Sequence, residues 1–292
     1  MLYFFLTLFF FSTLEIASKP LMGLLDPFFL TLIRFSIGLI TILFFMFLSG
    51  QGKSFFKLTR KQIITLGLLG VLNVFFSMSM LQLAVKTSSA STAAVVFCSN
   101  PLFVLMFSIF NGEAKASIKN IVPILLGIAG VVFVKVDNGL NLDHGVIYAL
   151  LASVSFAFYT VLNKKILKKT NPMTTNAVSF LFGVIALFLF ILLSGRINND
   201  SITNIKNFDL GSILTILYLG VFVSGLGYFT FFKTLQKYSA VSSSYIFLLK
   251  PSIATILAII LLGERVGLNF WVGMLMIVSG GIMILRTRKK AG

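Results

Sequence analysis

Residues 87–113 read TSSASTAAVVFCSNPLFVLMFSIFNGE, and residues 238–264 read YSAVSSSYIFLLKPSIATILAIILLGE. Both stretches open with serines, carry one proline in the middle and close on Gly-Glu, and their first and last residues have the same separation along the chain. A shared order of this kind indicates an internal repeat. The sequence therefore predicts two copies of one unit, residues 1–140 and residues 141–292.

The composition places these units in a membrane. Hydrophobic residues make up 58% of the 292 residues, charged residues only 11%, and the mean hydropathy is +1.01. Such values exclude an ordinary soluble protein. With one cysteine, Cys98, and one histidine, His144, no intramolecular disulfide, metal centre or other cofactor is expected.

Ten apolar runs are long enough to cross the ~30 Å hydrocarbon core as helices. Their approximate spans are 2–20, 27–48, 62–84, 88–111, 118–136, 145–167, 172–194, 211–233, 239–262 and 268–286. Because each unit then holds an odd number of helices, the two units must enter the membrane in opposite directions. We expect an all-α integral membrane fold of ten transmembrane helices, built as two inverted five-helix repeats. Inverted repeats of this kind are typical of secondary transporters.

The ten helices divide the basic residues unevenly between the two sides of the membrane. Most of the 24 Lys and Arg residues fall on one set of alternate connections and on the C-terminal tail, whereas the basic residues of the opposite set are matched by acidic ones. Because cytoplasmic loops retain Lys and Arg, both termini are expected to be cytoplasmic, in a multi-pass protein of the cell membrane. The positive charge is scattered over short loops, so a nucleic-acid partner is not expected.

Pro101 and Pro251 interrupt the two repeated segments near their middle. Proline removes a backbone donor and displaces the carbonyl one turn earlier, so both residues predict helix breaks. Broken backbone within a membrane is tolerated where it is buried against protein or lines a cavity. The two prolines would meet near the midplane, although a simple bend explains them as well.

Three ionisable residues lie within the apolar runs, where each costs at least ~2.5 to 3.5 kcal/mol unless it is paired or hydrated. Glu15 and Arg34 have similar expected depths, so an ion pair between them is plausible, with Lys19 as a competing partner. Whether such a pair is structural or a gate stays open. Lys250 lies close to the expected bilayer centre, with no acidic residue expected at its depth. A substrate carboxylate, carbonyls freed by the proline, or partial neutrality would each account for it.

Other polar residues complete the expected site. Candidates for substrate binding or gating beside Lys250, Arg34 and Glu15 are Asn100, Asn73, Tyr159 and Tyr245. Asn100 is the repeat counterpart of Lys250. Of the three ionisable residues, none has a charged counterpart in the other unit.

The chain resembles the EamA-type ten-helix members of the drug/metabolite transporter superfamily over essentially its whole length. The resemblance rests on Lys19-Pro20, on Arg34 within LIRFSIG, and on the repeated segments with their Ser/Ala-rich start, central proline and Gly-Glu end. It implies a five-plus-five inverted repeat around a central cavity. It also implies transport of small metabolites, amino acids or drugs, often outward.

The leading hypothesis is a secondary transporter that exports a small molecule by alternating access, with protons as a potential coupling ion through Glu15. A passive channel or facilitator is the alternative. An enzyme is disfavoured because there are no paired midplane carboxylates and no nucleophile with an evident base. The expected partners are the small-molecule substrate and the lipid bilayer, and a homodimer is left open.

Overall fold

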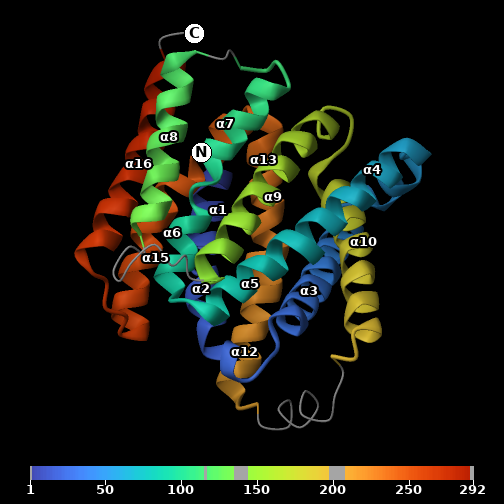
Figure 1. Cartoon of the computed structure of the whole chain (residues 1–292). Helices are drawn as coiled ribbons and strands as arrows, with labels where there is room; N and C mark the ends of the chain where they lie inside the picture. The colour runs from blue at the N-terminus through green and yellow to red at the C-terminus, as the bar shows by residue number, and fades with distance from the viewer. Residues whose placement is uncertain (1, 115–116, 135–143, 197–207, 290–292) are drawn as a thin grey trace.

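The structure is a computed structural model that describes residues 2–114, 117–134, 144–196 and 208–289 (Figure 1). Within these residues all regular secondary structure is helical. The expected boundary between the two units, at residues 140 and 141, lies outside the described residues.

The helices of the first unit follow the expected apolar runs, several of them in more than one piece. They are α1 (Leu2–Ser12), α2 (Leu14–Ser18), η1 (Lys19–Gly23), α3 (Pro27–Leu48), η2 (Gln51–Lys57), α4 (Arg60–Gly70), η3 (Val71–Ser77), α5 (Met78–Thr87), α6 (Ala90–Phe97), α7 (Asn100–Phe110) and α8 (Ile118–Phe133).

The helices of the second unit also follow the expected apolar runs. Its helices are α9 (His144–Ile166), α10 (Pro172–Leu193), α12 (Leu210–Tyr218), η4 (Leu219–Gly227), α13 (Tyr228–Lys237), α14 (Ala240–Ser244), α15 (Ile246–Leu262) and α16 (Leu268–Lys289). Eight helical runs in the described residues are long and apolar enough to cross a membrane, and Ile118–Phe133 and Leu268–Met283 are shorter apolar helices.

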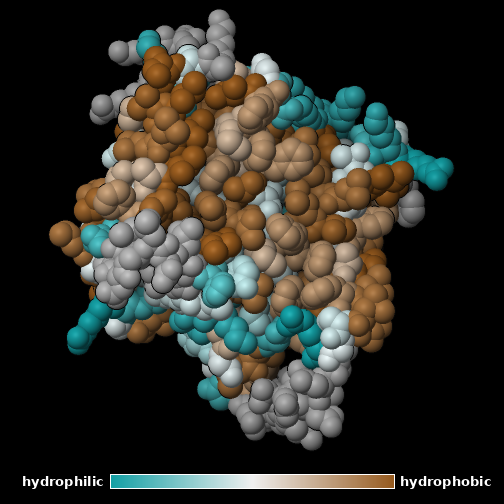
Figure 2. Space-filling view, in the orientation of Figure 1, coloured by the Kyte–Doolittle hydropathy of each residue, from teal (hydrophilic) through white to brown (hydrophobic). Residues whose placement is uncertain are grey.

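The surface fits this assignment. Large apolar side chains such as Phe47, Phe110 and Leu193 are about 80% exposed (81%, 79% and 84%), which a soluble protein rarely tolerates in number. Figure 2 shows apolar side chains over most of the visible face, with hydrophilic side chains gathered towards the ends of the molecule. The apolar surface is therefore the lipid-facing surface.

Helices α3 and α10 begin in the same way because their sequences carry the same start signal. Asp26 and Asn171 each accept a hydrogen bond from a backbone N–H of the first turn, and a proline follows each of them directly. A side-chain acceptor followed by proline is a strong helix start, since the proline removes an N–H that would lack a partner.

Both units also contain a π-helical segment at the corresponding place. η3 lies between α4 and α5, and η4 lies between α12 and α13. π-Helical turns are rare and are found mostly at functional sites. Here they bring buried polar residues, among them Asn73 and Ser224, towards the middle of the molecule.

Close backbone approach joins the units at two equivalent glycines. A Cβ atom at Gly183 in α10 would lie 2.5 Å from the carbonyl oxygen of Gly70 in α4, and one at Gly38 in α3 would lie 2.9 Å from Ser224 Cβ in η4. Any larger residue would force these helices apart. Figure 1 shows α3, α4 and α10 together at one side of the bundle, and α8 packed against α16 at the other.

The interruptions near the two prolines differ. The segment with Pro101 breaks at Cys98 and Ser99, directly before α7, as the sequence predicts. Pro251 instead lies inside α15, and the interruption of its segment falls earlier, at Tyr245. The helix-break expectation for Pro251 is therefore corrected: the proline is accommodated within a continuous helix.

Candidate functional site

A buried ion pair joins the first and ninth apolar runs. Glu15, in α2 just after the interruption at Thr13, accepts a hydrogen bond from Lys250 in α15, with 2.5 Å between Oε1 and Nζ. Both side chains are 0% exposed. The structure thus corrects two expectations: Glu15 pairs with Lys250 rather than Arg34, and Lys250 does have an acidic residue at its depth.

Lys19 does not compete for Glu15. Its ammonium group donates to the backbone carbonyls of Val85 at 2.8 Å and Ser88 at 2.5 Å, where α5 ends. These carbonyls lack partners within their own helix. Lys19 therefore closes a helix end and leaves the Glu15 carboxylate to Lys250.

Arg34 in α3 is fully buried, and within the described residues none of its three guanidinium nitrogens has a hydrogen-bond partner. The guanidinium carbon lies 4.7 Å from the centre of the Phe35 ring, and Glu15 and Tyr228 are within its electrostatic reach. Because Lys250 already neutralises Glu15, the three buried charges sum to one positive charge. An unpaired buried charge is costly, so this arrangement calls for a partner.

Several polar side chains linked to Tyr228, and others elsewhere in the core, also lack partners among the described residues. The Tyr228 hydroxyl donates to Asn73 Oδ1 at 3.3 Å, and Tyr159 lies close to Ser179 and Asn73. In the described residues, the buried polar atoms without a hydrogen-bond partner include Asn73 Nδ2, Tyr159 Oη, both side-chain polar atoms of Asn176, Ser179 Oγ and Ser224 Oγ. Native proteins leave few such groups unsatisfied, so the linked group of Asn73, Tyr159, Ser179 and Tyr228 is a candidate binding place.

Asn176, Ser179 and Ser224 were not among the residues expected from the sequence. Asn176 and Ser179 lie one helical turn apart in α10, just after the buried Thr174 and Thr175 and before a long apolar stretch, and both are 0% exposed. Polar residues at that spacing share one face of a helix. Their periodicity within an apolar run was the available signal.

Asn100 makes a structural contact through its Nδ2, while its Oδ1 has no hydrogen-bond partner among the described residues, so its expected role in substrate binding stays a prediction. Its Nδ2 donates to the Ser153 carbonyl in α9 at 3.0 Å, and the Ser153 hydroxyl donates to the Phe97 carbonyl at 3.1 Å. Phe97 is the carbonyl that Pro101 leaves without its helical donor. Asn100 and Ser153 therefore fasten the break between α6 and α7 to α9. Tyr245 lies half-buried at the interruption between α14 and α15.

Aromatic side chains fill the space between the two buried cations. This aromatic cluster is buried and comes from both units; its members are Phe11, Phe35, Phe97, Phe156, Phe180, Tyr228, Phe231 and Phe247. Lys250 Nζ lies 5.0 Å from the centre of the Phe97 ring. Arg34 lies over the Phe35 ring, which contacts the other rings of the cluster through Phe180 and Tyr228. Each cation thus gains from an aromatic face.

At one end of the molecule, Glu264 ties the second unit to the first. Its carboxylate accepts hydrogen bonds from the Ala90 and Ser91 amides at 2.6 and 3.0 Å and from the Ser91 hydroxyl at 2.5 Å. A carboxylate at a helix start is stabilised by the unpaired amides and the helix dipole. The sequence predicts no contact of this kind for Glu264, which ends the second repeated segment and is one of the acidic residues that balance the basic residues of the opposite loops.

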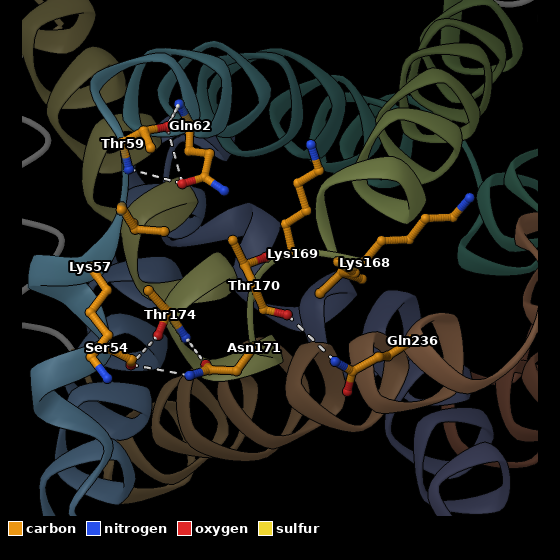
Figure 3. A pocket seen from close by; sticks show the side chains of 12 residues that line it. Ser54, Lys57, Thr59, Gln62, Lys168, Lys169, Thr170, Asn171, Thr174 and Gln236 are labelled. Carbon is orange, nitrogen blue, oxygen red and sulfur yellow. Dashed lines mark hydrogen bonds between the residues drawn. The ribbon is translucent and has the colours of Figure 1, made fainter.

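At the opposite end, which we call the lysine-rich end, the units meet around a cavity of about 510 Å³. Asn171 Nδ2 donates to Ser54 Oγ at 3.1 Å, and Ser54 and Thr174 are joined through their hydroxyls at 2.6 Å (Figure 3). The residues lining the cavity include Lys57, Lys168 and Lys169, and no acidic residue. Hydrogen bonds between residues of the two units are therefore present at both ends.

The fold is a helical bundle with a lipid-facing surface. Buried charges and polar groups lie where its two halves meet. These features define a multi-pass membrane transport protein. Comparison with known families gives the particular one. The model of the EamA-like transporter family matches residues 1–136 and again residues 143–286, so the chain belongs to this family. It is a membrane transporter and not an enzyme, consistent with a place in the cell membrane.

Similar proteins support the assignment. A protein of Clostridium kluyveri named an uncharacterized transporter is 39% identical, over 98% of this chain and 93% of its own length. A WAT1-related chloroplastic protein of Arabidopsis thaliana is 24% identical, over 88% of this chain and 62% of its own. A crystal structure with 18% identity covers 100% of this chain and 98% of its own with a TM-score of 0.72, which shows a shared fold.

Proposed function

We propose that this protein is a secondary transporter that moves a small organic molecule by alternating access, with its binding site among Arg34, Asn73, Tyr159 and the Glu15–Lys250 pair. The observation that carries the proposal is the position of these groups. Charged and unpaired polar side chains are fully buried where residues of both units meet. Ionisable groups at membrane depth are costly and mark substrate or ion pathways.

The proposed movement is a rocking of the two units about this site. The matched helix starts, the paired π-helical segments and the double family match all support two inverted repeats related by a pseudo-two-fold axis. Opening the Glu264 end would break the bonds from Glu264 to α6. Opening the lysine-rich end would break the bonds of Ser54 to Asn171 and Thr174.

The direction that we propose is export. The lysine-rich end would face the cytoplasm, because cytoplasmic loops retain Lys and Arg. The cavity at this end would then receive a metabolite, amino acid or drug from inside the cell. Release on the other side would follow when the Glu264 bonds open.

Counterflow in reconstituted vesicles tests the mechanism. A thermal-stability screen against amino acids, nucleosides and cationic drugs selects a ligand, and vesicles loaded with unlabelled ligand are then given a trace of labelled ligand outside. A carrier must accumulate label transiently above equilibrium, because inward movement of label is coupled to outward movement of ligand. A passive channel gives no overshoot and no saturation, and that result would refute alternating access.

A further inference from the structure

We propose that Arg34 binds the carboxylate of the transported molecule, and that this molecule is a monoanionic organic acid, or an acid group on a larger body, with an apolar or aromatic remainder. The inference rests on the proposed function and names the substrate class of the same site.

The balance of buried charges leaves Arg34 as the cation without an acidic partner in the described membrane-spanning helices. Of the cations in the described membrane-spanning helices that lie fully buried, Lys250 is engaged by Glu15 and Arg34 has none of its donors engaged. A guanidinium group presents its N–H donors in a planar fork that matches a carboxylate. One bound carboxylate would bring the sum of Glu15, Lys250 and Arg34 to zero, whereas a phosphate dianion would overshoot it.

The neighbours of Arg34 are also suited to an anion. Among the described residues, Asn73 Nδ2 and the hydroxyls of Tyr159 and Ser179 make no hydrogen bond of good geometry, although Tyr159 lies within hydrogen-bonding reach of Ser179 and Asn73. Each of these groups can donate to a carboxylate oxygen, and hydrogen bonds to an ionised acceptor are the strong ones. Glu15, the described carboxylate within electrostatic reach of Arg34, is already bonded to Lys250, so an acceptor from outside would suit this set of donors.

The remainder of the substrate is inferred from the rings beside Arg34. Phe35, Phe180 and Tyr228 contact one another edge to face, with ring centres 4.8 to 5.5 Å apart. A ligand placed on Arg34 would meet this face with its apolar part. Ligand sites commonly combine an apolar, aromatic lining with a few placed polar groups. The site would therefore reject small inorganic anions and strongly hydrated polyanions.

Glu15 is the competing partner for Arg34. Its Oε2 has no hydrogen-bond partner among the described residues, so the carboxylate could turn from Lys250 towards Arg34. In that case Arg34 would hold a mobile acid of the protein rather than a substrate. The two roles differ in what they predict for ligands, because only a substrate-binding arginine makes affinity depend on a ligand carboxylate.

The test compares acids with their primary amides on the purified full-length protein. The probes are 3-phenylpropanoate, indole-3-propanoate and hexanoate, each with its carboxamide, and phenyl phosphate as the dianion. Ligand-induced thermal stabilisation is measured for the wild type, for R34Q and R34K, and for R196Q as a control. Arg196 makes a surface ion pair with Asp26 and carries the same substitution.

We expect the aromatic acids to stabilise the wild type and R196Q, and the amides and phenyl phosphate to have little effect. R34Q should bind the acids about tenfold to a hundredfold more weakly, the range for losing a charged hydrogen-bond partner. It should also fold with undiminished thermal stability, because it removes an unpaired buried charge. R34K, with the charge but not the fork, should keep the preference for acids at reduced affinity.

Three results would overturn the inference: no acid stabilises the wild type at millimolar concentrations, the amides bind as well as the acids, or R34Q keeps the response to the acids. Should R34Q fail to fold, the acid–amide comparison on the wild type and R34K decides instead. Counterflow of a bound acid is scored separately. Binding through Arg34 without counterflow would refute the transport mechanism and leave the anion site standing.

Discussion

Glu15 in α2 and Lys250 in α15 form an ion pair with no solvent exposure, and this pair joins the first unit to the second. Taking two charges out of water is expensive, and their attraction offsets that cost only while both partners are present. Glu15 Oε2 has no partner in the described part of the chain, so the pair is incompletely satisfied. Such a pair suits a contact that has to break and re-form.

The first prediction concerns the stability of this pair. Glu15→Gln leaves the buried Lys250 and Arg34 charges without an acid, and it should lose about 3 to 5 kcal/mol of unfolding free energy. Lys250→Met should lose less than Glu15→Gln, because the Glu15 carboxylate can then turn towards Arg34, which lies within its electrostatic reach. The double variant should also lose less than Glu15→Gln, because Arg34 is then the one charge of the three that remains. Denaturation in mixed micelles measures the unfolding free energy of the wild type, the two single variants and the double variant. If the losses of the two single variants add up in the double variant, the two residues do not interact.

The second prediction concerns protons. A protonated Glu15 no longer balances Lys250, which changes the relative free energy of conformations that keep or break the pair. If transport is coupled to protons here, uptake by Glu15→Gln vesicles should lose its dependence on a pH gradient while counterflow persists. Glu113→Gln is the control, since Glu113 is a partly exposed acid 3.9 Å from Lys165. A gradient dependence that survives in Glu15→Gln would remove Glu15 from this role.

The third prediction uses Cys98, the chain's single cysteine, as a reporter for the Glu264 end. Its thiol is fully buried, directly after α6, and lies within electrostatic reach of Lys250 and Glu15. Glu264→Gln weakens the bonds to the Ala90 and Ser91 amides. We expect this variant to open the Glu264 end more often, and Cys98 to react several-fold faster with a membrane-impermeant maleimide added from that side.

Asp209→Asn provides the matched control for Glu264→Gln. Asp209 also accepts hydrogen bonds at a helix start, from Ser212, and these bonds lower the pKa of its exposed carboxyl group. It does not bridge the two units, so its loss should leave the labelling rate of Cys98 unchanged. Equal rates in the wild type and Glu264→Gln would show that Glu264 does not hold this end closed.

The sequence predicted the helices well because their signals are local. Apolar length, Asp26-Pro27 and Asn171-Pro172 at two helix starts, and the proline before α7 each act within one turn or one segment. The interruption at Tyr245 was missed because proline can sit inside a helix when neighbouring groups compensate, and Pro251 does so in α15. A break depends on its surroundings as well as on the residue.

The partners of the charged residues could not be read from the sequence. Depth along a helix brought Glu15 and Arg34 to the same level, but depth does not say which faces meet. The interruption at Thr13 separates α1 from α2, and Glu15 follows it on a helix that contacts α15. In this position the carboxylate bonds to Lys250, and Arg34 makes no hydrogen bond with any described residue. Glu15, Arg34 and Lys250 have no charged counterparts in the other unit, and that this difference marks the functional site remains a prediction.

The last prediction asks whether Asn100 and its partner Ser153 contribute to stability or to ligand binding. The Ser153 hydroxyl satisfies the Phe97 carbonyl that Pro101 deprives of its helical donor. Ser153→Ala should therefore cost about 1 to 3 kcal/mol, the range for a buried acceptor left without a partner.

Pro101→Ala restores an amide that can donate to Phe97, so the double variant Pro101→Ala with Ser153→Ala should recover part of the loss. Thermal unfolding of the wild type, both single variants and the double variant measures the coupling. Asn100→Ala should likewise lower stability while ligand affinity stays unchanged, because its Nδ2 is committed to the Ser153 carbonyl. A selective loss of ligand affinity in Asn100→Ala, with stability intact, would instead return Asn100 to the binding site.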